Sequence, residues 1–194
     1  HEFCKKKHFK TNYVKGLVDK NIMELYELEL SRLEQQEIQG VPLVNLNEEQ
    51  LKAYNYLSNS SKDVTLLHGV TSSGKTEVYI HLIKDAVVAG KQVLFLVPEI
   101  ALTTHLVTRL RNAFGDIVGV YHSRFGMNER AELRRDTNSN NNRFPIIIGT
   151  RSSVFLPFQV LGLIIVDEEH ESSFKQKDPA PRYQARDLAV YMGR

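Results

Sequence analysis

The sequence predicts an α/β fold in which a parallel sheet carries helices on both faces. Three observations indicate this class. Several short apolar runs lack the polar alternation of a half-exposed strand. Segments of helical periodicity separate these runs, as in parallel strands joined by crossover helices. A glycine-containing loop also joins one apolar run to an amphipathic segment, which is typical of a strand that hands over to a helix in this class.

Expected strands and helices alternate from residue 47 onward. The apolar runs predict strands at Val64–Leu67, Gln92–Val97, Ile117–Tyr121, Ile146–Ile148 and Leu163–Val166. Helical periodicity predicts helices at Glu48–Leu57, Lys75–Val88, Leu102–Phe114 and Met127–Asp136. Gly90 is expected to end the second helix, since glycine is favoured just beyond a helix C-terminus. The polar tract Asn138–Asn142 predicts a surface loop.

The first 40 residues are expected to be separate from the rest. Thr11 is a candidate N-cap for a short helix, and Asn21 is a candidate stop. Alternation through Tyr26–Leu30 then predicts a ribbon, followed by a linker that ends near Pro42. We therefore assign the α/β domain to residues 41–194.

Composition excludes several classes of protein. The chain has 194 residues, a net charge of +2 and 42% hydrophobic residues, as expected of an ordered globular protein. Its one cysteine, Cys4, excludes a disulfide framework or a multi-cysteine zinc site within this sequence and fits a reducing cytosol. No apolar run approaches membrane-spanning length, so we expect a cytoplasmic protein without a membrane partner. The chain lacks an initial methionine and stops inside an expected helix, so we expect it to be a fragment.

The stretch GVTSSGKT, residues 69–76, predicts a triphosphate site. It matches G-x-x-x-x-G-K-[ST] between an expected strand and an expected helix, the context that this motif requires. Backbone N–H groups at a helix N-terminus lack intrahelical partners and attract phosphate, and Gly69 and Gly74 let the backbone curl around it. Lys75 is expected to reach the β- and γ-phosphates, and the Thr76 hydroxyl to bind Mg²⁺.

A second group of candidate catalytic residues follows the last expected strand. Asp167 and Glu168 lie at the carboxyl end of the apolar run in LGLIIVDEEH. Asp167 is expected to hold Mg²⁺, and Glu168 to orient and deprotonate an attacking water. His170 is expected to link the γ-phosphate to neighbouring loops.

Five motifs in order resemble one family. D-E-x-H with the glycine loop is similar to the superfamily-2 helicases and translocases, as are LNEEQ, VPEIALT and IGTRSSVF. GVTSSGKTEVY, LVPEIALT, GTRSSVF, LGLIIVDEEH and SFKQKDPAPRYQARDLAV together resemble the replication-restart helicases within that superfamily. The resemblance covers about residues 46–194 and implies a RecA-like P-loop sheet. Residues 11–20 resemble, more weakly, the end of that family's winged-helix domain.

The resemblance implies an ATP-dependent, 3′-to-5′ DNA helicase acting in replication restart and primosome assembly at stalled forks. Its partners would be forked and single-stranded DNA, primosome proteins and single-strand-binding protein. The nucleotide contacts would come from Gln50, Gly69, Val70, Thr71, Ser72, Ser73, Gly74, Lys75, Thr76 and Glu77. The DNA contacts would come from Pro98, Thr150, Arg151, Phe174, Lys175, Lys177, Arg182 and Tyr183. The family's second motor lobe and its zinc-binding insertion have no counterpart in this sequence, so we expect weak nucleotide binding and little turnover.

Two alternatives stay open. The first is an RNA helicase or a restriction translocase built on the same sheet, against which the loop Phe174–Asp187 argues. The second is a non-catalytic DNA-binding and protein-docking module with a vestigial nucleotide pocket. The intact Lys75, Thr76, Asp167 and Glu168 argue against that second alternative. Basic residues near both ends of the chain permit a nucleic-acid partner, but a solvated surface explains them equally well.

Overall fold

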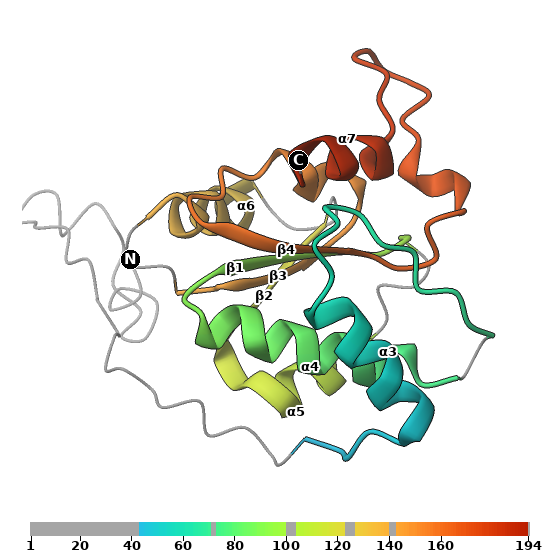
Figure 1. The fold of residues 1–194 in the computed structure, drawn as a ribbon. Helices are drawn as coiled ribbons and strands as arrows, with labels where there is room; N and C mark the ends of the chain where they lie inside the picture. Colours follow the sequence, from blue (N-terminus) through green and yellow to red (C-terminus); the bar gives the residue numbers. More distant parts are fainter. Residues whose placement is uncertain (1–42, 71–72, 100–103, 123–126, 140–142, 194) are drawn as a thin grey trace, which may run out of the picture. The chain divides into compact units, whose positions relative to one another are not determined.

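The computed structural model describes residues 43–193 except 71–72, 100–103, 123–126 and 140–142 (Figure 1). The expected winged-helix remnant and linker, residues 1–40, lie outside the described residues. In the described part, helices lie on both sides of a central sheet (Figure 1). The predicted α/β class with a parallel, RecA-like sheet is confirmed.

The sheet contains four parallel strands. They are β1 (Gln92–Leu96), β2 (Val118–Tyr121), β3 (Ile146–Gly149) and β4 (Leu161–Val166). Their order is β2-β3-β1-β4, so β1 is central and pairs with both β3 and β4. The register places Phe95 beside Ile148 on one side and beside Ile165 on the other. Because the strands are parallel, their carboxyl ends share one edge of the sheet.

β1 and β3 are buried on both faces, as the absence of polar alternation predicts, whereas β4 at the sheet edge is only partly buried. Val93, Phe95 and Val97 contribute to one hydrophobic cluster, together with side chains of α4 (Lys75–Val88) and α5 (Thr104–Phe114). Leu94 and Leu96 contribute to the second cluster. That cluster includes side chains of α6 (Met127–Thr137), α7 (Ala185–Met192) and the short 3₁₀ helices η2 (Arg151–Phe155) and η3 (Ser172–Phe174). The two-residue period of the strands thus divides the core into two layers.

Two further helical elements complete the described part of the chain. A third short 3₁₀ helix, η1 (Gly115–Ile117), connects α5 to β2. The helix α3 (Glu48–Ser58) precedes the glycine loop and lies beside α4 (Figure 1). A capping box fixes its start, since Asn47 accepts from the Gln50 amide and the Gln50 side chain accepts from the Asn47 amide. Among the described helices, none has both the length and the apolarity needed to cross a membrane.

One predicted strand is wrong. Val64–Leu67 forms no strand pairing, and 50% of Val64 and 71% of Leu66 are exposed. An apolar run becomes a strand only when a neighbour satisfies its backbone hydrogen bonds. In the described part of the chain, β4 pairs with β1 alone, and no strand occupies its outer edge. The sequence shows correctly that this segment is apolar. It does not show whether another strand lies beside the segment to pair with it.

Candidate functional site

The glycine loop ends at Gly74, and α4 begins at the next residue. Gly74 has a φ of +80° and forms the N-cap of α4, with its carbonyl accepting from the Glu77 amide at 3.0 Å. A side chain there would be strained by the left-handed backbone. A Cβ would also lie 2.1 Å from the Gln50 Nε2. Thr71 and Ser72 of the predicted phosphate loop lie outside the described residues.

The Lys75 ammonium lies within the curve of this loop. Its Nζ donates to the Gly69 carbonyl at 2.8 Å and to the Val70 carbonyl at 3.1 Å. The side chain therefore folds back over the loop that precedes it, at the place where the motif predicts phosphate. Thr76, the next residue, is half-buried at the start of the same helix.

Gln50 reaches the loop from α3. Its Nε2 lies 3.4 Å from the Ser73 carbonyl and 3.4 Å from the Gly74 carbonyl. The same side chain completes the capping box of α3, so its position is held from two sides. The structure thus brings Gln50 and the glycine loop together, as expected of a nucleotide-contacting glutamine.

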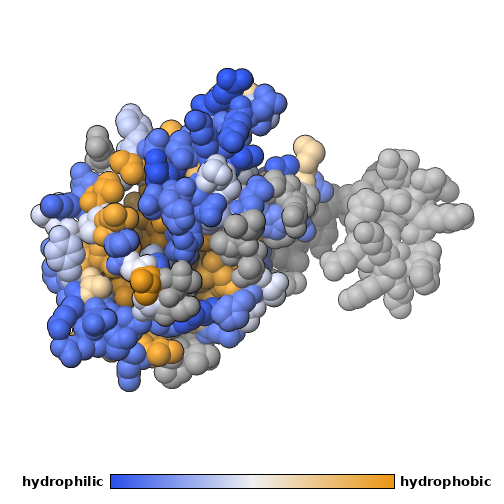
Figure 2. Space-filling view, turned by 90° about the vertical axis from the view of Figure 1, so that its right-hand side faces the viewer, coloured by the Kyte–Doolittle hydropathy of each residue, from blue (hydrophilic) through white to orange (hydrophobic). Residues whose placement is uncertain are grey.

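Asp167 lies at the carboxyl end of β4, where its backbone N–H donates to the Leu96 carbonyl of β1 at 2.9 Å. Burial, and next the negative charge of Glu168, raise the pKa of the Asp167 carboxyl. The Lys75 ammonium lowers that pKa, so the two groups are close enough to interact. The lysine of the glycine loop and the acid of β4 therefore lie near the same sheet edge. Figure 2 views the molecule from the side on which β4 ends in Figure 1; hydrophilic residues there surround a hydrophobic centre.

Sequence reasoning missed Tyr79 at this site. Burial, and next the charges of Asp167 and Glu168, raise the pKa of its hydroxyl, which lies close enough to the Asp167 carboxyl to lower the pKa of that acid in turn. The ring is buried and meets Phe95 edge-on, with ring centres 5.7 Å apart. The available signal was spacing: Tyr79 follows Lys75 by four residues, so both lie on one face of α4.

The turn after Asp167 has an unusual backbone. Glu168 has a φ of 48°, which makes it the one non-glycine residue with a positive φ in the described part of the chain. This region strains an L-residue and is often found at functional sites. The Glu168 Oε2 lies 3.9 Å from the His170 Nε2, and both side chains are exposed. The two predicted catalytic side chains are therefore neighbours at the sheet edge.

Glu77 faces α5 rather than standing free beside the loop. Its buried carboxylate forms an ion pair with Arg109 of α5. An ion pair in such a position holds two packed helices in register, because either charge alone would be costly to bury. The predicted nucleotide contact by Glu77 has no support in this geometry.

The candidate DNA-contacting residues divide into an exposed and a buried group. Lys175 and Gln184 form an antiparallel bridge, and the Gln176 amide donates to the Tyr183 carbonyl at 2.9 Å. These pairs close a hairpin whose tip projects beyond α7 (Figure 1). Lys175, Lys177 and Arg182 are exposed on it. Arg151 donates from η2 to the Lys175 carbonyl at 3.4 Å, which ties it to the hairpin base.

Three predicted DNA contacts are contradicted by burial. Phe174 is fully buried in the second hydrophobic cluster, where its ring fills the space between the sheet and α7. Thr150 is buried and caps η2, and Pro98 is buried just beyond β1. An aromatic residue in a basic loop suggested stacking, but the ring contributes more to stability inside the core. None of these three side chains presents a surface to DNA here.

An ion pair joins α7 to the acidic turn. The Arg186 Nη1 lies 3.2 Å from the Glu169 Oε2, and its Nε donates to Asp187 at 3.1 Å. Glu169 follows the two predicted catalytic acids directly, and Arg186 lies in the first turn of the helix that follows the hairpin. The acidic turn and the helix that follows the hairpin are therefore connected through side chains as well as through the chain.

The family follows from the comparison with known sequence families. The profile described as DEAD/DEAH box helicase matches residues 47–190, which include the loop, the acidic turn and the hairpin. The chain belongs to this helicase family. The match spans the whole described sheet, so the motifs of the family and the geometry above coincide.

Individual relatives show which members of the helicase family the chain resembles. The chain is 48% identical over 153 residues to the replication restart protein PriA of Chlamydia trachomatis. The aligned region covers 77% of this chain and 20% of that protein. It is 39% identical over 196 residues to the PriA of Bacillus subtilis, covering 97% of this chain and 24% of the relative. It is 43% identical over 178 residues to the PriA of Synechocystis, covering 91% of this chain and 21% of the relative. The chain therefore spans no more than about a quarter of these relatives.

Proposed function

We propose that this chain is the ATP-binding motor lobe of a DNA helicase that acts in replication restart. The observation that carries the proposal is that Lys75, at the start of α4, and Asp167, at the end of β4, lie close enough for the lysine to lower the pKa of the acid. A cation and a carboxylate supplied by two separate motifs are the pair that a metal–triphosphate requires. The names of the PriA relatives support the role in replication restart.

The residues of the sheet edge have separate roles in this proposal. Lys75 exchanges its two loop carbonyls for phosphate oxygens, while Gln50 contacts the base from α3. Thr76 and Asp167 would hold Mg²⁺, and the raised pKa of the half-buried Asp167 fits an acid that lacks a full counter-charge. When bound, the metal neutralises charge that develops on the phosphates. Glu168 orients the attacking water, with His170 beside it.

The DNA surface consists of Arg151, Lys175, Lys177, Arg182 and Tyr183. Cations of this kind hold phosphates without reading sequence, and an aromatic ring among them offers a stacking face. On this proposal the whole protein unwinds forked DNA with 3′-to-5′ polarity in the cytoplasm. Primosome proteins and single-strand-binding protein are its proposed partners there.

The ion pair between Arg186 and Glu169 is the proposed connection between DNA and ATP. A strand held by the hairpin displaces α7, and the pair transmits that displacement to the turn that carries Glu168. In the full-length protein, Arg186→Ala should reduce the DNA stimulation of ATPase while leaving the DNA-free rate close to wild type. Arg186→Lys keeps the charge and serves as the matched control. Undiminished stimulation in Arg186→Ala would show that the coupling runs elsewhere.

Titration of the 194-residue chain with a fluorescent ATP analogue, with and without Mg²⁺, tests the proposed function. Loss of a charge-assisted hydrogen bond predicts that Lys75→Ala binds the nucleotide about ten- to a hundredfold more weakly. Lys62→Ala, an exposed lysine outside the loop, should bind as wild type does. In the full-length protein, single-stranded DNA binding that persists with no measurable nucleotide affinity would instead favour a non-catalytic DNA-binding module.

A further inference from the structure

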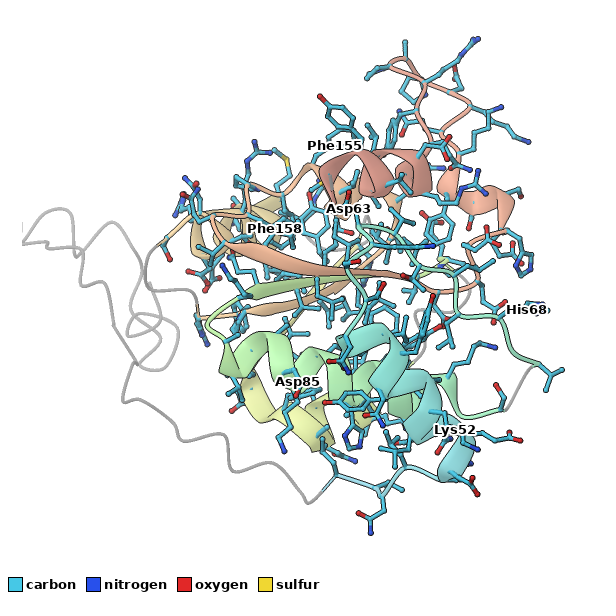
Figure 3. The ribbon with its side chains drawn as sticks, viewed as in Figure 1. Lys52, Asp63, His68, Asp85, Phe155 and Phe158 are labelled. Atoms are coloured by element: carbon cyan, nitrogen blue, oxygen red, sulfur yellow. The ribbon has the colours of Figure 1, made fainter. Side chains whose placement is uncertain are left out.

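Phe155 is an aromatic ring that the fold leaves at the surface. Half of it, 51%, is exposed at the end of η2, whereas its neighbours Val154 and Leu156 are buried (Figure 3). Because both neighbours are anchored in the core, the backbone holds the ring in its outward position. The sequence places this residue at the end of IGTRSSVF, which resembles a strand-contacting motif of the superfamily, but not among the predicted DNA contacts.

Tyr183 supports the Phe155 ring from the hairpin side. The two rings meet edge-on, with centres 4.8 Å apart and planes at 75°. Tyr183 pairs through its carbonyl with the Gln176 amide, so the hairpin base fixes the tyrosine in turn. Two elements far apart in the sequence thus build one aromatic pair. Phe155 is the exposed member of this pair. It lies outside the loop Phe174–Asp187, in which the sequence predicts most of the DNA contacts.

Positive charge surrounds this pair. Arg151, from the same 3₁₀ helix as Phe155, donates to the Ser173 carbonyl at 3.5 Å and the Lys175 carbonyl at 3.4 Å. Its charge also lowers the pKa of Tyr183 against the larger, raising effect of burial. Lys177 and Arg182 directly follow and precede the paired residues Gln176 and Tyr183. Within the described residues, no ion pair neutralises Arg151, Lys175, Lys177 or Arg182.

We propose that Phe155 stacks on an unpaired base of single-stranded DNA, with Tyr183 behind the ring and Arg151 and the hairpin cations along the phosphates. This rests on the proposed function and assigns its base-stacking residue. An exposed ring beside unneutralised cations matches a strand that carries both a π-face and a negative charge per nucleotide. Phe174, which the sequence favoured for this role, is enclosed in the core and cannot perform it.

The test compares strands that differ only in their bases. The chain is titrated with a fluorescein-labelled oligonucleotide of about 20 thymidines and with one of equal length that carries abasic sites. Phe155→Ala should bind the thymidine strand roughly tenfold more weakly than wild type and the abasic strand equally well. Phe155→Trp should restore binding to the thymidine strand. Arg151→Ala should weaken binding to both strands, since phosphates are common to them.

Controls separate loss of stacking from loss of structure. Val88→Ala removes an exposed apolar side chain from α4 and should leave both affinities unchanged. Urea midpoints of Phe155→Ala and wild type should agree, because the ring is half exposed. Equal losses on the thymidine and abasic strands, or no loss on either, would overturn the stacking role while the proposed helicase function stands. A wild-type chain that binds neither strand would contradict the proposed DNA partner as well.

Discussion

The Tyr79 hydroxyl lies beside the Asp167 carboxyl and, as a potential hydrogen-bond donor, lowers its pKa, which couples α4 to the end of β4 at the proposed nucleotide site. The tyrosine ring is held against Phe95 of the central strand, so the donor has little freedom. Lys75, one helical turn earlier, acts on the same carboxylate through its charge. One face of α4 therefore supplies both the cation and the hydrogen bond that favour ionised Asp167.

Tyr79→Phe should weaken Mg²⁺-dependent nucleotide binding and shift its pH dependence upward. The hydrogen bond lowers the pKa of Asp167, so its removal raises that pKa and leaves less of the ionised form that binds metal. The loss of one buried hydrogen bond should also reduce the free energy of unfolding by about 1 kcal/mol. Nucleotide titrations across a range of pH would measure the first effect, and urea unfolding the second.

The control for that substitution is Tyr56→Phe, because Tyr56 lies on α3 with its ring exposed. It should match wild type in affinity, pH profile and stability. A pH profile of Tyr79→Phe that coincides with wild type would show that the hydroxyl does not act on the metal-binding carboxylate.

Asp167→Asn should stabilise the chain at neutral pH while abolishing Mg²⁺-dependent binding. The folded pKa of Asp167 lies above the ordinary value of 3.8, so the folded state holds this proton more tightly than the unfolded state. Stability is therefore lost as pH rises from 3.8 through the raised folded pKa, and the loss is complete above it. Asparagine removes this loss and can still accept from Tyr79.

Urea unfolding at about pH 4 and about pH 7 measures the difference in stability between Asp167→Asn and wild type. That difference should be larger at the higher pH. Asp116→Asn, an exposed acid after α5, is the control and should show a similar difference at both values. A difference for Asp167→Asn that does not grow with pH would contradict the raised pKa.

Gly74→Ala should destabilise the chain more than Gly90→Ala. Both positions have positive φ, +80° and +70°, so each substitution costs about 1–2 kcal/mol in backbone strain. Nothing lies within 4 Å of a Cβ at Gly90, whereas a Cβ at Gly74 would displace the Gln50 side chain from the loop. The excess cost of Gly74→Ala should shrink when Gln50 is also replaced by alanine, as a double-mutant cycle of unfolding free energies would reveal. If the unfolding free-energy changes of the two substitutions add, the Gln50 side chain does not contact Gly74 in solution.

Glu168→Gly should be more stable than Glu168→Ala by about 1 kcal/mol, because glycine relieves the positive φ and alanine does not. The same pair of substitutions at His170, whose φ is not positive, should show no such advantage for glycine. Thermal or urea unfolding of the four variants makes the comparison. Equal stability of Glu168→Gly and Glu168→Ala would mean that the backbone at residue 168 leaves the positive-φ region once the glutamate side chain is removed.

The sequence predicted the elements whose residues carry their own signal. Val93–Leu96 and Ile146–Ile148 are apolar throughout, and parallel strands buried on both faces require such runs. The glycine, lysine and threonine spacing likewise placed Lys75 at the start of α4. These predictions succeeded because neighbouring residues along the chain determine the pattern.

Only tertiary structure decided the properties that depend on distant partners. The backbone of Val64–Leu67 required a strand beside it, and Phe174 required a choice between the core and the solvent. Tyr79 and Phe155 acquired their positions from Asp167 and Tyr183, which lie many residues away. The sequence by itself thus determined the class of the sheet and predicted the type of ligand that we propose at its edge. Packing determined which side chains lie at that edge, because burial and hydrogen bonding are set by contacts that no local pattern contains.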